Sequence, residues 1–201
     1  AGNIAVPAVC ITDMLLNPGK PIEFNGAKFD YPDIRLIYWC GGTPFHHQQN
    51  LNRLIEGWRR PETVIVNEIA WTATARHADI VFPATTTLER NDITASGADR
   101  YLFAMHQAID PVAEARNDFD IFADLADRLG FREEFTEGRN EKEWLRHLYD
   151  LSRQQGAQHG VELPDFDVFW KSGYIDVPPP EEPGILMSEF RHDPNAHPLK
   201  T

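Results

Sequence analysis

The clearest pattern in the chain is a series of short apolar runs separated by polar segments. Ile34–Cys40 is apolar at nearly every position, which is typical of a strand covered on both faces of a sheet. Thr63–Asn67 and Ala78–Pro83 predict two further strands. Apolar residues three and four positions apart predict a helix over Gln48–Arg60, and Thr72–His77 predicts a shorter one.

This order of strands and helices predicts an α/β fold. Strands that alternate with helices through short connections favour a Rossmann-like parallel sheet with helices on both faces, a three-layer α/β/α arrangement. Ligands of such sheets bind at the carboxyl ends of the strands. Those ends are residues 41–47, 67–71 and 83–92.

The rest of the chain predicts loops and further helices. Residues 17–33 carry turn signals and predict an irregular loop, and residues 94–110 predict an antiparallel excursion around Ser96-Gly97. We expect one α/β domain over residues 1–176, followed by a Pro-rich exit segment over residues 177–201.

Three helices are predicted in the second half of the chain. The first begins at Asn117 or Asp118 and runs to Leu129, where Gly130 ends it. Glu141–Gln155 and Pro164–Lys171 are the other two. The inward face predicted for the helix over Glu141–Gln155 consists of Trp144, Leu145, Leu148 and Leu151.

Composition and charge exclude several classes of partner. With 42% hydrophobic residues the chain can bury a core, and its net charge of -12 argues against a nucleic-acid or anionic membrane surface. No apolar run approaches the ~20 residues of a membrane span. The two cysteines, Cys10 and Cys40, make neither a disulfide framework nor a zinc site, and Cys40 is predicted to be a buried apolar thiol.

The most informative segment is Tyr38–His47, where the first strand stops at Gly41 and Gly42. Glycines let a ligand approach the main chain, and amides at the following helix start can hold phosphate oxygens. An ordinary strand-to-helix turn is the alternative. His46 and His47 point in different directions, so hydrogen bonding to a polyanion is favoured over zinc binding, with a solvated helix start as the alternative.

Polar residues also follow the second and third strands. Glu68, after Asn67, stands where dinucleotide folds place the acid that contacts the ribose, although a helix N-cap pair explains it equally well. Arg90 can contact a phosphate or pair with Glu89 or Asp92. The chain has no G-x-S-x-G, P-loop lysine or H-E-x-x-H motif, so the sequence indicates binding and not reaction chemistry.

Three segments together resemble one family. They are residues 38–48, residues 62–92 and the stretch from Glu114 to Gly130, and the most specific part is T-A-R-H-A-D-I-V-F-P-A-T-T-T-L-E-R-N-D over residues 74–92. These segments resemble the molybdopterin oxidoreductases of the dimethyl sulfoxide reductase family. The nearest branch contains the trimethylamine N-oxide, dimethyl sulfoxide and biotin sulfoxide reductases, and the resemblance covers essentially all 201 residues.

The resemblance implies a function for a larger protein of which this chain is a fragment. The family holds molybdenum with two molybdopterin guanine dinucleotides, and two Rossmann-like domains each receive one guanosine arm. This chain resembles the central domain and its exit segment. The serine that binds molybdenum lies in the family's N-terminal part, so the resemblance implies no catalytic residue and no metal ligand here.

The resemblance also implies the partners and the limits of the isolated chain. The rest of the same polypeptide and a small S- or N-oxide substrate are the expected partners, and the isolated chain is expected to be inactive. Whether it binds cofactor alone stays open, as does location in the bacterial periplasm or cytoplasm. The alternatives are a stand-alone nucleotide-binding module and a structural domain without catalysis.

The cofactor contacts implied by the resemblance lie at the three strand ends and on the following helix. Asp120, or less favourably Asp118, would accept hydrogen bonds from the guanine edge. Thr43 departs from the family, which usually has Asn after the glycine pair, and a hydroxyl cannot reproduce an amide's paired contacts. The implied positions are Gly41, Gly42, Thr43, His47, Asn67, Glu68, Arg90 and Asp120.

Overall fold

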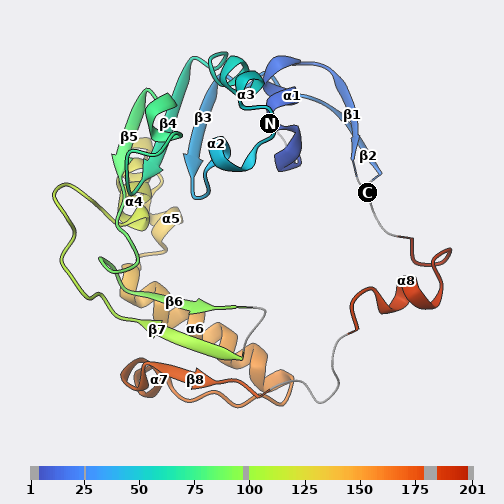
Figure 1. The fold of residues 1–201 in the computed structure, drawn as a ribbon. Coiled ribbons are helices and arrows are strands. Elements are labelled where there is room, and N and C mark those ends of the chain that lie inside the picture. The colour runs from blue at the N-terminus through green and yellow to red at the C-terminus, as the bar shows by residue number, and fades with distance from the viewer. Residues whose placement is uncertain (1–4, 25, 97–99, 179–184, 199–201) are drawn as a thin grey trace. The chain divides into compact units, whose positions relative to one another are not determined.

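A computed structural model describes residues 5–24, 26–96, 100–178 and 185–198. The chain divides into two compact units, Ala1–Val81 with Glu182–Thr201, and Phe82–Glu181. A parallel three-stranded sheet with helices confirms the predicted α/β class (Figure 1). The assignment of residues 1–176 to one domain stays a prediction.

The parallel sheet follows the three predicted strands. β3 (Leu36–Cys40) pairs in parallel with β4 (Thr63–Glu68), and β5 (Ile80–Pro83) is third in the order β3-β4-β5. The register sets Cys40 opposite Asn67. The carboxyl ends of β3 and β4 therefore lie side by side, as the sequence predicts.

The prediction that the first strand is covered on both faces is wrong. Leu36 is 54% exposed, and Cys40 is exposed at the other end of β3. The buried strand is β4, whose Val64 and Val66 belong to the core. The physical reason is strand order, because β3 is an edge strand with one neighbour and β4 lies in the middle. The prediction of Cys40 as a buried thiol is wrong for the same reason.

The helix predicted over Gln48–Arg60 forms as α3 (Leu51–Trp58), and a separate one-turn helix, α2 (Pro44–His47), precedes it. Asn50, in left-handed conformation with φ +54°, separates them. Its side chain accepts a hydrogen bond from the Arg53 amide at 3.3 Å and so caps α3. The short helix predicted over Thr72–His77 is a single 3-10 turn, η2 (Ala75–His77).

The core of the first unit joins α3 to the sheet and to α1 (Ile11–Leu16), which follows the 3-10 turn η1 (Ala8–Cys10). A Cβ added to Gly57 of α3 would lie 3.2 Å from the Cβ of Leu15, so the glycine permits the close approach of α1 and α3. The buried members of this core are Leu15, Phe45, Leu54, Trp58, Val64 and Val66.

The loop predicted over residues 17–33 is a hairpin. β1 (Pro21–Phe24) pairs antiparallel with β2 (Ala27–Asp30). Gly26, at φ +77°, belongs to the connection, and its neighbour in the Asn-Gly pair lies outside the described residues. Asn-Gly is a strong hairpin signal, so the turn was recognised in the sequence while the four-residue strands beside it were not.

The second unit contains an antiparallel sheet, in the order β6 (Asp92–Ala95), β7 (Tyr101–Met105) and β8 (Tyr174–Asp176). The predicted antiparallel excursion is thereby confirmed, although Gly97 of its turn lies outside the described residues. Helices α6 (Glu141–Gln158) and α7 (Phe166–Ser172) pack on this sheet (Figure 1). The buried residues of the cluster are Ala104, Leu145, Tyr149, Phe166 and Phe169.

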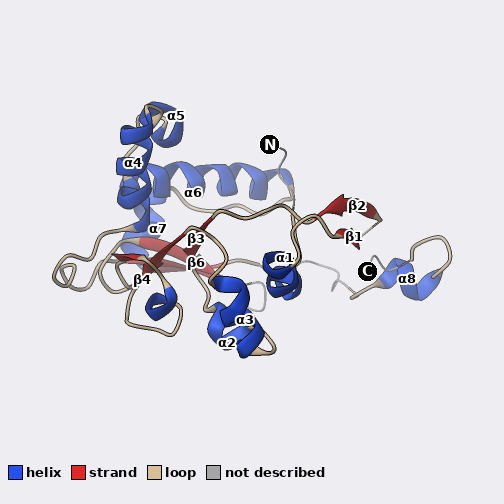
Figure 2. Cartoon of the chain, turned by 90° about the horizontal axis from the view of Figure 1, so that it is seen from above, coloured by secondary structure: helices blue, strands red, loops and turns tan. Residues whose placement is uncertain are grey.

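The helices predicted in this unit form close to their predicted bounds. α4 (Asp118–Leu129) begins after Asn117, whose side chain accepts from the Phe119 amide, and Gly130 ends it at φ +85°. α5 (Arg132–Thr136) lies against α4 (Figure 2). The remaining helices are α6 (Glu141–Gln158), α7 (Phe166–Ser172) and α8 (Ser188–His192).

The inward face predicted for α6 is wrong in part. Leu148 and Leu151 are 51% and 41% exposed, whereas Leu145 and Tyr149, four residues apart on one face, are buried. Tyr149 stacks on Phe169 of α7 with ring centroids 4.6 Å apart, and this contact selects the buried face. Among the described residues, no helix is long and apolar enough to cross a membrane.

Candidate functional site

The glycine turn after β3 presents open backbone. Gly41 and Gly42 both adopt left-handed conformation, at φ +72° and +67°. A Cβ added to either would meet no heavy atom within 4 Å, and both residues are exposed. Trp39 supports the turn, because its indole N–H donates to the carbonyl oxygen of Gly42 at 3.2 Å. The turn therefore offers main-chain groups to a ligand without an intervening side chain.

Thr43 and His47 lie on the helical turn that follows the glycines. The Thr43 carbonyl accepts from the amides of His46 at 2.8 Å and His47 at 3.2 Å. The Thr43 side chain makes no cap hydrogen bond, and its backbone is extended. His47 is exposed at the end of α2. Both side chains accordingly border the glycine turn, although α2 is only one turn long.

Asn67 is held at the end of β4. It is 6% exposed, and the Tyr38 hydroxyl from the neighbouring strand donates to its Oδ1 at 3.1 Å. The register opposite Cys40 places it beside the strand position that precedes the glycines. The structure thus brings Asn67 to the same edge of the sheet as the glycine turn.

Glu68 is engaged within its own segment. One carboxylate oxygen accepts from the Ile69 amide at 3.0 Å, and the other accepts from the Thr72 hydroxyl at 2.9 Å. The Thr72 oxygen in turn accepts from the Ala75 amide at 3.2 Å. Glu68 thus holds the turn after β4, but it caps no helix, because the N-cap of η2 is Thr74. A ribose contact by Glu68 stays a prediction.

In the second unit, the segment from Thr85 to Asp92 is internally bonded. The Arg90 guanidinium donates to the Thr85 carbonyl at 2.9 Å and contacts the Asp92 carboxylate at 3.2 Å. Glu89 is buried and accepts from the amides of Thr86 at 2.7 Å and Val112 at 2.6 Å. These backbone hydrogen bonds hold the pKa of Glu89 below its usual range.

Of the two partners considered for Arg90 in the sequence, Asp92 is therefore the one that pairs with it. With 22% of its side chain exposed, the guanidinium reaches the surface while two of its directions are occupied. The segment presents a cation that is already oriented. A contact with phosphate or pterin stays a prediction.

Asp120 lies in the first turn of α4 and is exposed, whereas Asp118 is half-buried. The backbone carbonyl of Asp120 accepts from the Arg116 guanidinium at 3.4 Å. An exposed carboxylate in a fixed first helical turn can accept hydrogen bonds from a planar donor edge such as that of guanine. The structure thus agrees with the preference for Asp120 over Asp118 without testing it.

Glu141 belongs beside these residues, and no motif in the sequence pointed to it. Its Oε1 accepts from the Asn91 amide at 3.1 Å. The pKa of Glu141 is raised, first by burial and then by the negative charges of Asp120 and Asp92. Interactions with Asn117 and with the Asn91 amide lower it in part. The available signal was the capping box of Asn140 with Glu143, which identifies Glu141 as a further acid in the first turn of α6.

The predicted site residues thus form two groups, each within one unit. The first unit brings the ends of β3 and β4 together, and in the second the Glu141 carboxylate bonds the amide of Asn91, next to Arg90, and lies near Asp120. No cluster of three or more His, Cys, Asp or Glu in the described ranges could hold a metal ion. The group in the first unit consists of Gly41, Gly42, Thr43, His47, Asn67 and Glu68.

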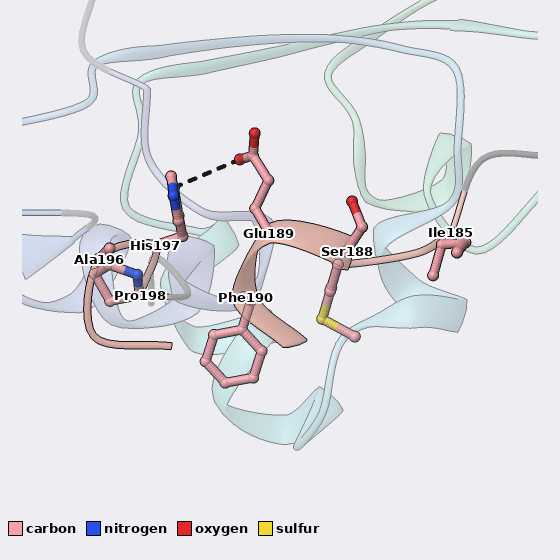
Figure 3. Close-up of a pocket in the computed structure, with 8 residues that line it drawn as sticks. Ile185, Ser188, Glu189, Phe190, Ala196, His197 and Pro198 are labelled. Atoms are coloured by element: carbon pink, nitrogen blue, oxygen red, sulfur yellow. Dashed lines mark ion pairs between the residues drawn. The ribbon is translucent and has the colours of Figure 1, made fainter. Parts of the chain in front are cut away.

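A separate cavity of about 680 Å³ lies within the C-terminal segment (Figure 3). It is lined by residues between Ile185 and Pro198, and Glu189 and His197 face each other across it at 3.6 Å. None of the predicted site residues lines it. This cavity is therefore independent of the candidate site.

Comparison with known proteins decides the family. The molybdopterin oxidoreductase family model matches residues 17–128, more than half of the chain. The chain belongs to the molybdopterin oxidoreductase family. The resemblance seen in the sequence is thereby confirmed.

Individual relatives match nearly the whole chain. A biotin sulfoxide reductase of Cereibacter sphaeroides is 51% identical over 99% of this chain and 27% of its own length. A dimethyl sulfoxide/trimethylamine N-oxide reductase of Rhodobacter capsulatus is 45% identical over 100% and 25%, respectively. A trimethylamine-N-oxide reductase of Haemophilus influenzae is 44% identical over 98% and 24%. The chain spans about a quarter of the length of these curated relatives.

A solved structure supports the fold alone. Acetylene hydratase from Pelobacter acetylenicus superposes with a TM-score of 0.58 at 18% identity, over 77% of this chain and 20% of that one. The family implies a molybdenum–pterin cofactor. The observed geometry fits such a group at the glycine turn, because two consecutive left-handed glycines leave space that a side chain would otherwise fill.

Proposed function

We propose that this chain is one segment of a molybdenum-dependent S- or N-oxide reductase, and that it binds one guanosine arm of a bis(molybdopterin guanine dinucleotide) cofactor. The observation that supports this most is the identity of 44–51% to relatives named sulfoxide or N-oxide reductases, over nearly the whole chain. The chain itself would supply binding, since the sequence carries no recognised nucleophile motif.

The chain's own groups divide the work of binding between backbone and side chains. The bare backbone at Gly41 and Gly42 would hold phosphate oxygens, and Asn67 would add a fixed polar side chain beside it. The Asp120 carboxylate would accept from the N1–H and 2-amino groups of guanine, while Arg90 would balance negative charge. When bound, the cofactor supplies the chemistry of oxygen-atom transfer.

A direct assay tests the division between binding and catalysis. The purified 201-residue chain is expected to show no reduction of trimethylamine N-oxide or dimethyl sulfoxide with a chemical electron donor, because it spans only about a quarter of the length of its relatives. A full-length trimethylamine N-oxide reductase in the same assay is the positive control. Turnover by the 201-residue chain would contradict the proposal.

The second candidate is a stand-alone nucleotide-binding module. It is favoured by the fact that the glycine turn and its support from Trp39 form within this chain alone. Calorimetric titration with GDP separates the two functions. Binding tighter than millimolar supports the module, and weaker but detectable binding supports a segment whose site other parts of the polypeptide complete.

A further inference from the structure

Glu141 connects the two segments that carry the predicted contacts of the second unit. Its carboxylate accepts from the amide of Asn91, the residue next to Arg90. The side chain of Asn117 lies near this carboxylate and lowers its pKa. The Asn117 oxygen caps α4 by accepting from the Phe119 amide. One carboxylate thus joins the Arg90 segment to the cap of the helix that carries Asp120.

A second connection lies on the other side of Arg90. Ala84 and Arg116 form an isolated parallel bridge. The Thr85 amide donates to the Arg116 carbonyl at 3.0 Å, and the Arg116 amide donates to the Pro83 carbonyl at 3.0 Å. The segment is therefore fixed to the start of α4 on the side that precedes Arg90. On the other side, Asn91 also accepts from the Gln107 amide at 3.2 Å and Asp92 pairs with Met105, so removing Glu141 would remove only the link from Asn91 to α6.

The position of this carboxylate is electrostatically unfavourable. Glu141 is half-buried, and Asp92 and Asp120 add negative charge from the strand-end segment and from α4. Neutral side chains of similar size would avoid this cost. A partly desolvated acid with specific charged neighbours inside a candidate site is a recognised signature of a functional residue.

We propose that Glu141 is a positioning residue, which holds the Arg90 segment and the first turn of α4 in register so that a guanosine phosphate ligand meets Arg90 and Asp120 together. This inference rests on the proposed function for the ligand. The positioning itself depends only on the contacts of Glu141, so the two can be tested apart.

Nuclear magnetic resonance of the 201-residue chain tests the positioning first. The side-chain Nε–H of Arg90 and the amide of Asp120 are expected to shift with pH at the midpoint of the Glu141 carboxyl, above the usual glutamate range. Asp92 and Asp120 are the other acids that face Glu141. Glu141→Gln keeps the shape of the side chain. It should abolish this pH-dependent shift (the pH step) at both the Arg90 Nε–H and the Asp120 amide.

Glu143→Gln is the matched control, because it removes the same charge from the same helical turn. Its carboxylate accepts from the Asn140 amide at 2.8 Å, within α6 itself. The control should retain the step at Arg90 and Asp120. The positioning role is overturned if the step survives in Glu141→Gln, or if both variants remove it equally.

Titration with GDP supplies the second readout. In Glu141→Ala the apparent affinity reported by the Asp120 amide should fall by about tenfold, because the hydrogen bond from the Asn91 amide to a charged group is lost. Unchanged GDP shifts in this variant would overturn the positioning role while the proposed function stands. If the unmodified chain shows no GDP shifts, yet the pH step vanishes only in Glu141→Gln, the guanosine assignment fails and the positioning role stands.

Discussion

Two regions of the chain, one in each unit, present their candidate ligand contacts in different ways. In the first unit, the strand end is bare, since Gly41 and Gly42 expose backbone and leave open space around them. In the second unit, the strand end is filled with side-chain hydrogen bonds, and Glu89, Arg90 and Glu141 each have protein partners. One region therefore depends on backbone conformation, and the other depends on a polar network.

This difference indicates which substitutions each region tolerates. A bare turn loses function when a side chain is added, because the strain is local and the open space disappears. A polar network loses function when one member is removed, because its buried partners are left unsatisfied. The following substitutions test this contrast, beginning with the core that supports the network.

The largest effect is expected from Phe169→Ala. Phe169 is fully buried and stacks on Tyr149, so the substitution should lower the free energy of unfolding by about 3–5 kcal/mol. Urea denaturation followed by circular dichroism measures this change. Val168→Ala on the same helix is the control, because Val168 is exposed and its loss should cost less than about 0.5 kcal/mol. Equal losses would refute the assigned core.

Removing the cap of α4 should have a smaller effect. Asn117→Ala eliminates the bond to the Phe119 amide, so stability should fall by about 1–2 kcal/mol. Asn117→Asp retains the cap but places a negative charge beside Glu141, and it should raise the Glu141 pKa further. Thermal unfolding and a carboxyl titration by magnetic resonance measure the two effects. An unchanged Glu141 pKa in Asn117→Asp would break this account of the network.

Gly42→Ala tests the bare turn. Because φ at this position is +67°, alanine should cost about 1–2 kcal/mol from backbone strain, although the added Cβ meets no atom. Gln49→Ala, at a nearby exposed residue, is the control and should have little effect. The unfolding free energy from urea titration is the measurement. A neutral Gly42→Ala would show that the turn does not require its left-handed conformation.

The stabilisation that Glu89 contributes to the folded state should be lost in acid. Amide hydrogen bonds lower its folded pKa, so its stabilisation is present above the unfolded value of about 4.3 and is lost as pH falls through the lower folded pKa. Unfolding measured across this window should show a loss of stability that is reduced in Glu89→Gln. An identical acid profile for both proteins would contradict the assigned contacts.

The smallest effect is expected at Thr43. Thr43→Asn introduces the residue that the resemblance gives as usual at this position of the family. It should strengthen GDP binding by a few-fold, which corresponds to about one additional hydrogen bond. Asn is also at least as good a helix cap as Thr, so stability should not fall. Competition titration measures the affinity. Weaker binding by Thr43→Asn would mean that this position does not face the ligand.

Local signals in the sequence predicted the strands and α4 well. The apolar run before Asn67 identified β4, and Asn117 and Gly130 marked both ends of α4. The edge position of β3 was missed because an apolar run does not reveal strand order. The face of α6 was mistaken because Leu148 and Tyr149 are both apolar enough for a core, and only packing against Phe169 distinguishes them.

The candidate site shows the same limit. The sequence predicted the positions of Gly41, Gly42 and Asn67, because each directly follows or ends a strand that the apolar pattern identifies. Glu141 could not be predicted because its partner Asn91 lies 50 residues away in the chain. The hydrogen bond between Glu68 and the Thr72 hydroxyl was not predicted, because the sequence offered only a helix N-cap or a ligand contact for Glu68.

The central claim is that this chain contributes a guanosine-binding surface. Titration of the isotope-labelled 201-residue chain with millimolar GDP, followed by amide shifts, tests it most directly. The account predicts that shifts concentrate at Gly41–Thr43, Asn67 and the first turn of α4. Shifts confined to residues 185–198, or GDP shifts no larger than those given by inorganic diphosphate at Asp120, would contradict it.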